Sequence, residues 1–217
     1  MCPKGRRLDN ETNGRTILGM TKGVDTRDRI LDRAFRTASR DGLGGLSIGG
    51  LAGELGISKS GLFAHFGSKE ELEIGVLALA SERFQAAVLV PAFKAPRGIA
   101  RLRKLFDLWL RWSTDPSMPG GCIFMAAAAE LDDHEGKTRD YLVGAQKDLF
   151  AALAKSARLA IEAGDFEKGV DCDQLAFELF GIFAAFHHQK RLLRDPLAEK
   201  RARTAFERLI ASAMRAQ

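Results

Sequence analysis

Residues 46–72 read LSIGGLAGELGISKSGLFAHFGSKEEL, and this stretch decides how the N-terminal third of the chain folds. Ser47 can cap a short helix, because apolar residues follow it at i, i+3, i+4 and i+7 within Ile48–Leu55. Gly56 can adopt the positive φ that a tight turn between helices requires. Ser58 can then cap a second short helix. Two short helices joined by a glycine-containing turn predict a helix-turn-helix.

The end of the same stretch predicts the start of a long helix. Gly67 interrupts the second short helix, and Ser68 forms a capping box with Glu71 three residues later. The helical pattern then continues to Val90. We expect Pro91 to end this helix, because proline has no backbone N–H to donate.

A longer helix precedes the hairpin and can be capped by Asp25 or Thr26 and ended by Gly42. Helices of about two turns are unstable alone in water, so the two short ones must dock on the apolar face of this longer helix. We therefore expect residues 25–70 to form one three-helix domain. Residues 1–24 lack apolar periodicity and are expected to be a flexible arm; the alternative is a basic arm that touches DNA.

Helical spacing also dominates the rest of the chain. Alternating β-branched runs are nearly absent, while Ala, Leu, Arg, Lys and Glu recur at helical spacing between breaks that contain glycine or proline. The predicted fold class is all-α with about nine helices in total. An N-terminal helix-turn-helix domain is followed by a larger helical domain at residues 71–217.

Composition places the chain among soluble globular proteins, with 217 residues of which 46% are apolar and 28% charged. No window approaches the roughly 18 uninterrupted apolar residues of a membrane span, and the N-terminus has no apolar signal segment. Three scattered cysteines fit a reducing compartment, so we expect a cytoplasmic protein without a membrane partner. Residues 1–70 hold 12 Lys and Arg against 8 Asp and Glu, and so carry four of the five net positive charges.

The second short helix, from Ser58 to His65, suits the major groove of DNA. Its first residues are small, so the backbone can approach the bases, and Lys59 can reach a guanine edge or a phosphate. Ser47 and Lys69 lie at helix N-termini, where free backbone N–H groups favour phosphate oxygens. The simpler alternative is a helical hairpin that contacts no DNA. The residues predicted to contact DNA are Ser47, Ser58, Lys59, Ser60, Gly61, Phe63, His65 and Lys69.

Residues 26–72 resemble the DNA-binding domain of the TetR family of transcriptional regulators. The resemblance rests on the helix TRDRILDRAFRTASRDG, on LAGELGISKSGLFAHFGSKEEL, and on the run from Phe63 to Leu72 with its aromatic, His, Phe and Ser-Lys-Glu positions. Phe63 stands where the family usually has a tyrosine, and so lacks the hydroxyl that contacts phosphate. Gly49 and Gly50 replace a more helix-favouring pair, at a cost of about 1 kcal/mol each relative to alanine.

The resemblance implies a sequence-specific repressor. Two recognition units held by a helical dimer would bind an inverted-repeat operator in double-stranded DNA, and a small apolar or amphipathic effector would release them. Residues 71–217 would then be the ligand-binding and dimerisation domain.

The larger domain is rich in aromatic residues, which suit an apolar ligand cavity with a few polar groups. Ordinary core packing is the alternative for each of them. The residues expected to bind the ligand are Phe106, Trp109, Trp112, Phe124, Met125, Phe150, Phe180 and His187.

The last two helices carry apolar stripes that could form a four-helix interface between two subunits. The alternative is that both stripes close the core of the monomer. The residues expected at the dimer interface are Leu179, Ile182, Phe186, Ala202, Phe206, Leu209 and Ala213.

A helical enzyme is the rival class of protein. The acidic cluster of Glu130, Asp133 and His134 could bind a metal, but the chain has no Glu-x-x-His motif and a solvated charge run is the simpler explanation. Cys122 follows two glycines near a helix N-terminus, which could lower its pKa, although no basic residue is adjacent. We expect no catalytic residue, metal or other cofactor.

Overall fold

The computed structural model describes the backbone of residues 13–214 and the side chains of residues 25–214. Apart from one isolated bridge between Phe166 and Met214, this part of the chain consists of helices and turns, which confirms the predicted all-α class. It contains nine helices when α4, η1 and α5 are counted as one continuous rod. The elements are α1 (Asn13–Asp41), α2 (Ile48–Leu55), α3 (Lys59–Phe66), α4 (Lys69–Phe84), η1 (Gln85–Leu89), α5 (Val90–Phe93), α6 (Ile99–Trp112), α7 (Ile123–Leu131), α8 (Lys137–Glu162), α9 (Cys172–Arg191) and α10 (Ala198–Ala213).

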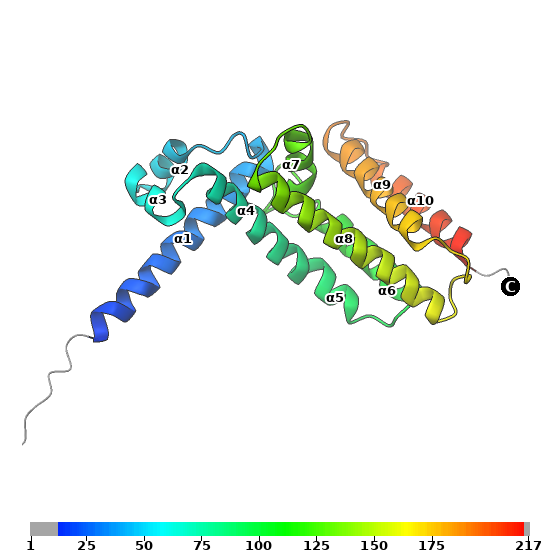
Figure 1. The fold of residues 1–217 in the computed structure, drawn as a ribbon. Coiled ribbons are helices and arrows are strands. Elements are labelled where there is room, and N and C mark those ends of the chain that lie inside the picture. The colour runs from blue at the N-terminus through cyan, green and yellow to red at the C-terminus, as the bar shows by residue number, and fades with distance from the viewer. Residues whose placement is uncertain (1–12, 215–217) are drawn as a thin grey trace, which may run out of the picture.

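The arrangement separates a small helix-turn-helix unit from a larger bundle. Figure 1 shows α2 and α3 beside α1 at one end of the molecule, and α9 beside α10 at the other end. Helix α4 starts in the small unit and continues into the bundle, where it packs against α8. The expected boundary at residue 70 therefore falls in the first turn of a helix that belongs to both parts.

The predicted caps of the helix-turn-helix are confirmed. The Oγ of Ser47 accepts a hydrogen bond from Gly50 N–H at 2.9 Å, and the Oγ of Ser58 accepts one from Gly61 N–H at 3.0 Å. Gly56 has a φ of 66°, the left-handed conformation that the turn between α2 and α3 requires. The Oγ of Ser68 accepts a hydrogen bond from Glu71 N–H at 3.0 Å and so opens α4.

Helix α1 is longer than expected. It begins at Asn13, so the flexible arm expected over residues 1–24 is corrected for residues 13–24, and residues 1–12 lie outside the described part of the chain. The reason is cooperativity: Ile30 and Ala34 are 0% exposed and anchor the helix, and extending an anchored helix costs little once its first turn has formed. No proline interrupts residues 13–24. An arm that touches DNA stays a prediction.

Pro91 does not end the long helix, contrary to expectation. The rod continues to Phe93, because the turn before Pro91 is a π-helix in which Val90 N–H donates to the Gln85 carbonyl five residues back. This wider turn shifts the hydrogen-bond register, so Pro91 sits at the start of a new α-helical segment, where its missing N–H costs least.

The rod from Lys69 to Phe93 is also the one stretch in the described chain that is long and apolar enough to cross a membrane. The core helix of a globular domain has the same composition. Leu72, Val76 and Leu77 are each 0% exposed and pack in the core, so part of the apolar surface of the rod belongs to the core of this domain. The stretch is therefore weak evidence for a membrane span.

Candidate DNA-binding surface and ligand cavity

Helix α3 has one face in the core and one face open to a partner. Leu62 and Phe66 are 0% and 7% exposed and fix α3 against the rest of the small domain. On the outer side, the Phe63 ring is 50% exposed. Of the eight residues predicted to contact DNA, Gly61 and His65 are half-buried and the other six are exposed. They come from α3 and from the starts of α2 and α4, which lie at one end of the molecule (Figure 1).

Two of the three glycines of α2 leave room for functional neighbours. A β-carbon at Gly49 would lie 3.0 Å from Cε of Lys59 and 3.4 Å from its Nζ. A β-carbon at Gly50 would lie 2.7 Å from the Oγ of Ser47, which caps α2. The side chain of Lys59 therefore lies against α2 beside Gly49. Any residue other than glycine at position 49 would crowd that side chain.

Two lysines on this surface have different surroundings. The Nζ of Lys69 lies 3.5 Å from the Gly44 carbonyl and 3.5 Å from Oε1 of Glu73. Lys59 has no ion pair or hydrogen-bonded acceptor among residues 25–214. The Lys59 ammonium is therefore free to move to a phosphate or base edge, whereas the Lys69 ammonium is already held between two oxygens.

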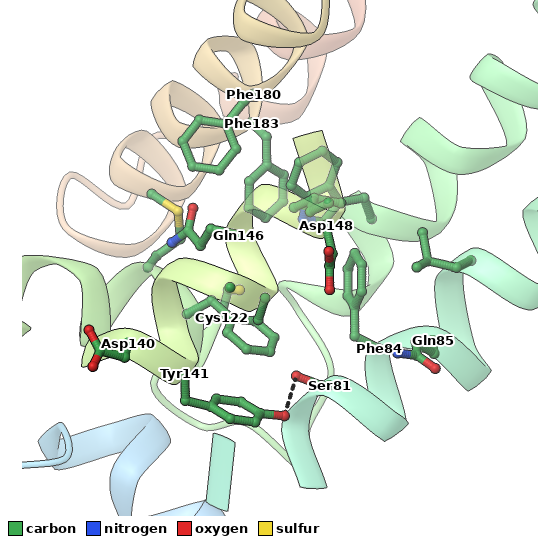
Figure 2. A pocket seen from close by; sticks show the side chains of 17 residues that line it. Ser81, Phe84, Gln85, Cys122, Asp140, Tyr141, Gln146, Asp148, Phe180 and Phe183 are labelled. Atoms are coloured by element: carbon green, nitrogen blue, oxygen red, sulfur yellow. Dashed lines mark hydrogen bonds between the residues drawn. The ribbon is translucent and has the colours of Figure 1, made fainter. Parts of the chain in front are cut away.

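The larger domain contains a cavity of about 370 Å³ between α4, η1, α6, α7, α8 and α9. Figure 2 shows aromatic rings and several polar side chains converging on it. The lining residues are Ser81, Phe84, Gln85, Leu89, Trp109, Cys122, Phe124, Met125, Asp140, Tyr141, Gly144, Ala145, Gln146, Asp148, Leu149, Phe180 and Phe183.

Four of the eight residues expected to bind a ligand lie on the wall of this cavity: Trp109, Phe124, Met125 and Phe180. The other four lie elsewhere in the larger domain. Sequence periodicity shows which residues are apolar but not which neighbour each ring faces, and this limits what it can assign.

The other three expected aromatic residues pack against neighbouring rings outside the lining of this cavity. The Phe106 ring stacks on Phe206 of α10 with centroids 4.2 Å apart. Trp112 is 5% exposed and meets Phe84 edge-on at 5.5 Å. Phe150 is tilted against Phe180 at 5.0 Å and lines a separate hollow between α7 and α8. These three residues are corrected from ligand contacts to packing residues.

His187 is also outside the cavity. Its Nε2 atom is buried without a hydrogen-bond partner in the described chain, and a β-carbon at Gly121 would lie 2.7 Å from it. Burial lowers the pKa of His187, and the charges of Arg191 and His188 lower it further. The imidazole is therefore neutral and packs behind the loop that precedes α7.

Sequence reasoning missed the wall that α8 contributes. Tyr141, Ala145 and Leu149 follow at i, i+4 and i+8, with Gly144 and Asp148 beside them. The hydroxyl of Tyr141 lies 3.4 Å from the Oγ of Ser81, so α8 and α4 also contact each other through polar groups (Figure 2). The helical spacing is the signal that could have found this wall, but small and polar residues do not stand out as the lining of an apolar cavity.

Cys122 lines the cavity but is not a reactive thiolate. It is 3% exposed, and burial raises the pKa of its thiol more than the backbone N–H groups of Met125 and Phe124 lower it. The thiol therefore stays protonated near neutral pH, which argues against the thiol chemistry considered from the sequence.

The residues of the acidic cluster considered for an enzyme have different surroundings in the structure. The carboxylate of Glu130 accepts hydrogen bonds from Leu43 N–H at 3.1 Å and Gly44 N–H at 2.8 Å. Asp133 and His134 are exposed. No group of three His, Cys, Asp or Glu residues able to hold a metal ion occurs in the described chain. Glu130 thus holds the end of α7 to the turn between α1 and α2.

The start of α7 is held to α1 as well. The buried hydroxyl of Ser39 donates to the Gly121 carbonyl at 3.1 Å and accepts from Gly120 N–H at 3.1 Å. A β-carbon at Gly120 would lie 1.5 Å from the Ser39 carbonyl oxygen, so only glycine permits this approach. On the far side, the Arg191 guanidinium of α9 donates to the Pro119 carbonyl. One loop therefore joins the helix-turn-helix domain, the cavity and α9.

The apolar stripes expected at the dimer interface are partly core. Leu179, Phe206 and Ala213 are 0%, 2% and 4% exposed and pack inside the monomer, so they are corrected from interface to core. Several of the larger side chains of α9 and α10 turn inward, whereas the small residues Gly181 and Ala185 are exposed.

The other four expected interface residues line a groove between α9 and α10 of about 710 Å³, although three of them (Phe186, Ala202 and Leu209) are also largely buried in the monomer. These residues are Ile182, Phe186, Ala202 and Leu209. The exposed Gly181 and Ala185 lie in the same groove, and Phe177, also on α9, is 65% exposed. This surface combines apolar area with small residues that allow another helix to approach.

Comparisons with known proteins agree with this geometry. The family model "Bacterial regulatory proteins, tetR family" matches residues 30–73, and the model "Tetracyclin repressor-like, C-terminal domain" matches residues 98–206. A curated relative, the uncharacterised HTH-type transcriptional regulator YezE of Bacillus subtilis, is 26% identical over 176 residues, which is 81% of this chain and 86% of the relative.

Solved structures share the fold. A TetR transcriptional regulator from Chloroflexus aurantiacus has a TM-score of 0.78 at 23% identity, covering 88% of this chain and 96% of that one. AibR, solved in complex with isovaleryl coenzyme A and operator DNA, has a TM-score of 0.69 at 21% identity, covering 87% of this chain and 97% of that one.

Proposed function

Because the chain belongs to the TetR family of transcriptional regulators, we propose that it is a homodimeric repressor released from its operator by a small molecule bound in the cavity. As a family member it is a DNA-binding transcriptional regulator. We further infer that it acts in the cytoplasm, where its operator lies, and has no catalytic activity. Glu130 is engaged by two backbone N–H groups and Cys122 is buried, which argues against the two sites considered for an enzyme.

Operator recognition is assigned to the outer face of α3. Lys59, Ser60 and Phe63 are exposed on this helix, whose inner residues are held in the core. One α3 helix reads few bases, so recognition of an operator requires two copies about 34–36 Å apart or a multiple of that distance. The two copies would contact the half-sites of an inverted repeat.

Dimerisation is assigned to the groove between α9 and α10. Two subunits related by a two-fold axis would each present α9 and α10 to form a four-helix interface. Gly181 and Ala185 allow close approach, and the exposed Phe177 offers apolar area for burial. This groove lies far along the molecule from α3, as the two ends of Figure 1 show.

The coupling between effector and DNA is assigned to α7. Hydrogen bonds join both the loop before α7 and the end of α7 to the helix-turn-helix domain, through Ser39 and Glu130 respectively, while the first turn of α7 supplies Phe124 and Met125 to the cavity wall. This arrangement is the observation that supports the proposal. A ligand that binds better when α7 is displaced will also favour displaced α3 helices. A coupling free energy of about 1–3 kcal/mol corresponds to a 5–150-fold fall in operator affinity.

A footprint on the promoter that flanks the protein's own gene tests the proposal. We expect a protected inverted repeat with wild-type protein and a weaker footprint with Lys59→Ala. Small molecules that bind the cavity should then shorten the lifetime of the complex with that repeat. A protein that protects no DNA at low salt would contradict operator binding, and cavity ligands that leave operator affinity unchanged would contradict the effector role.

A further inference from the structure

The cavity has an unbalanced charge. Its lining includes two carboxylates, Asp140 and Asp148, and no Lys, Arg or His. Figure 2 shows the Asp148 carboxylate turned toward the cavity, whereas that of Asp140 points away from it. Neither carboxylate has an ion pair or hydrogen-bonded donor among residues 25–214. The cavity therefore presents one negative charge that the described chain leaves uncompensated.

The position of Asp148 places this charge at the edge of an apolar chamber. Asp148 is exposed, and Gly144 lies one turn earlier on α8 with no atom near its missing β-carbon. Because Gly144 carries no side chain, the wall of α8 is open beside the carboxylate. A ligand could keep a polar group at this edge while its apolar part enters.

Aromatic rings form most of the chamber. Phe84 meets Trp109 edge-on at 6.1 Å and Phe124 edge-on at 6.4 Å, while Trp109 stacks on Phe183 at 4.1 Å. The faces of such rings carry the negative part of their quadrupole, which attracts cations and repels anions. A ring face that is open to the chamber would therefore favour the same sign of charge as Asp148.

We propose that the effector is an amphipathic organic cation, whose alkyl or aryl body fills the chamber and whose ammonium group lies against Asp148. The proposal rests on the effector role proposed above and deepens it. An anionic ligand would meet the carboxylate without any basic partner, and a neutral ligand would gain at most a hydrogen bond from it. A cation gains the ion pair and, in addition, any ring face that is open to the chamber.

Three probes of matched shape test the sign of the charge. Benzyltrimethylammonium, neopentylbenzene and phenylmethanesulfonate share a benzyl group and differ in the charge of a tetrahedral head. Binding is measured without DNA, by titration calorimetry and by tryptophan fluorescence, to which Trp109 in the wall and the nearby Trp112 both contribute. We expect the cation to bind at least roughly fivefold more tightly than the neutral probe, and the anion most weakly.

Asp148→Asn tests the residue, because it removes the charge and keeps the shape at an exposed position. We expect it to remove most of the preference for the cation over the neutral probe. Asp133→Asn is the matched control: it makes the same change in net charge at an exposed residue outside the cavity lining, and should keep the preference.

The outcomes separate this proposal from the effector role. Equal or tighter binding of the neutral or anionic probe, binding of none of the three, or an unchanged preference in Asp148→Asn would overturn the cation assignment. Operator release is measured separately, by anisotropy on the footprinted repeat. A cation that binds through Asp148 without affecting operator affinity would support the ligand class and contradict the effector role.

Discussion

The hydroxyl of Ser39 in α1 donates a 3.1 Å hydrogen bond to the carbonyl of Gly121, the residue before the cap of α7. Ser39 belongs to the helix-turn-helix domain, and Gly121 precedes Cys122 in the cavity wall. The two residues are 82 positions apart in the chain and both are buried. We assign to this hydrogen bond the coupling between the ligand cavity and the DNA-binding domain.

Ser39→Ala tests that route. The substitution leaves Gly120 N–H and the Gly121 carbonyl without their partner in a buried site, so we expect the free energy of unfolding to fall by about 1–3 kcal/mol in urea titrations. Operator affinity measured by anisotropy should also change severalfold, because the start of α7 is released from α1.

Ser156→Ala is the matched control for Ser39→Ala. Ser156 is 2% exposed, but its hydroxyl donates only to the Ala152 carbonyl in its own helix. We expect little change in operator affinity. If both alanine variants bound the operator as wild type does, the Ser39 contact would be structural only.

The two lysines of the DNA surface should differ in what they contribute. Lys59→Ala should weaken the cognate operator more than unrelated DNA, because Lys59 is free to reach bases. Lys69→Ala should weaken all sequences alike and lower the slope of log affinity against log salt by about 0.9 for each phosphate that the lysine neutralises. Anisotropy titrations at several salt concentrations measure both effects. Unchanged affinity in both variants would contradict this surface.

Gly49→Ala should couple to Lys59. Alanine favours the helix by about 1 kcal/mol, but its β-carbon would lie 3.0 Å from Cε of Lys59 and would push that side chain aside. We therefore expect a more stable protein with weaker operator binding. Combining Gly49→Ala with Lys59→Ala should cause no further loss of affinity.

Gly53→Ala provides the control within the same helix, since no atom lies within 4 Å of its missing β-carbon. It should stabilise α2 and leave operator affinity unchanged. If Gly49→Ala lowered operator affinity by the same factor in the wild-type protein and in the Lys59→Ala variant, Gly49 would affect binding by a route other than Lys59.

Local signals explain why the small domain could be predicted in detail. Ser47, Ser58 and Ser68 act on backbone N–H groups three residues away, so a short window of sequence contains both partners. Position 56 favours glycine because its backbone has a positive φ, which depends on that residue alone. The predicted end of the rod at Pro91 is wrong because the π-helical turn before it changes the hydrogen-bond register. No residue pattern in the sequence predicts that turn.

The cavity and the junction depend on partners far apart in the chain. From the sequence, Glu130 is grouped with Asp133 and His134 as a candidate metal cluster. In the structure the carboxylate of Glu130 instead accepts a hydrogen bond from Gly44, which lies 86 residues away in the chain. Phe106 and Trp109 share a helix but face different neighbours on α10 and α9. Periodicity identifies an apolar residue, and only the packing of whole helices decides whether it faces a cavity, a core or a partner.

Ala185→Glu tests the dimer face. Ala185 is exposed in the groove between α9 and α10. In a two-fold dimer each subunit would bury one such glutamate carboxylate at the interface, and neither carboxylate would have a basic partner. We expect light scattering to report a monomer and operator affinity to fall at least about tenfold, because paired half-sites need a dimer. Ala151→Glu, at an exposed position of α8 outside this groove, should remain dimeric. A dimeric Ala185→Glu protein would place the interface elsewhere.

His187 should make the stability of the protein depend on pH. Burial, Arg191 and His188 hold its pKa in the folded state below the unfolded value of about 6.5. The unfolded chain therefore binds the proton more tightly, and the stabilisation is complete above that unfolded value and is lost as pH falls below it toward the folded pKa. Unfolding free energies measured in urea between pH 7.5 and 5.5 should fall more steeply for wild type than for His187→Gln.

The neighbouring His188 serves as control, and His188→Gln should retain most of the wild-type slope. Identical slopes for all three proteins would mean that His187 is not held neutral behind Gly121.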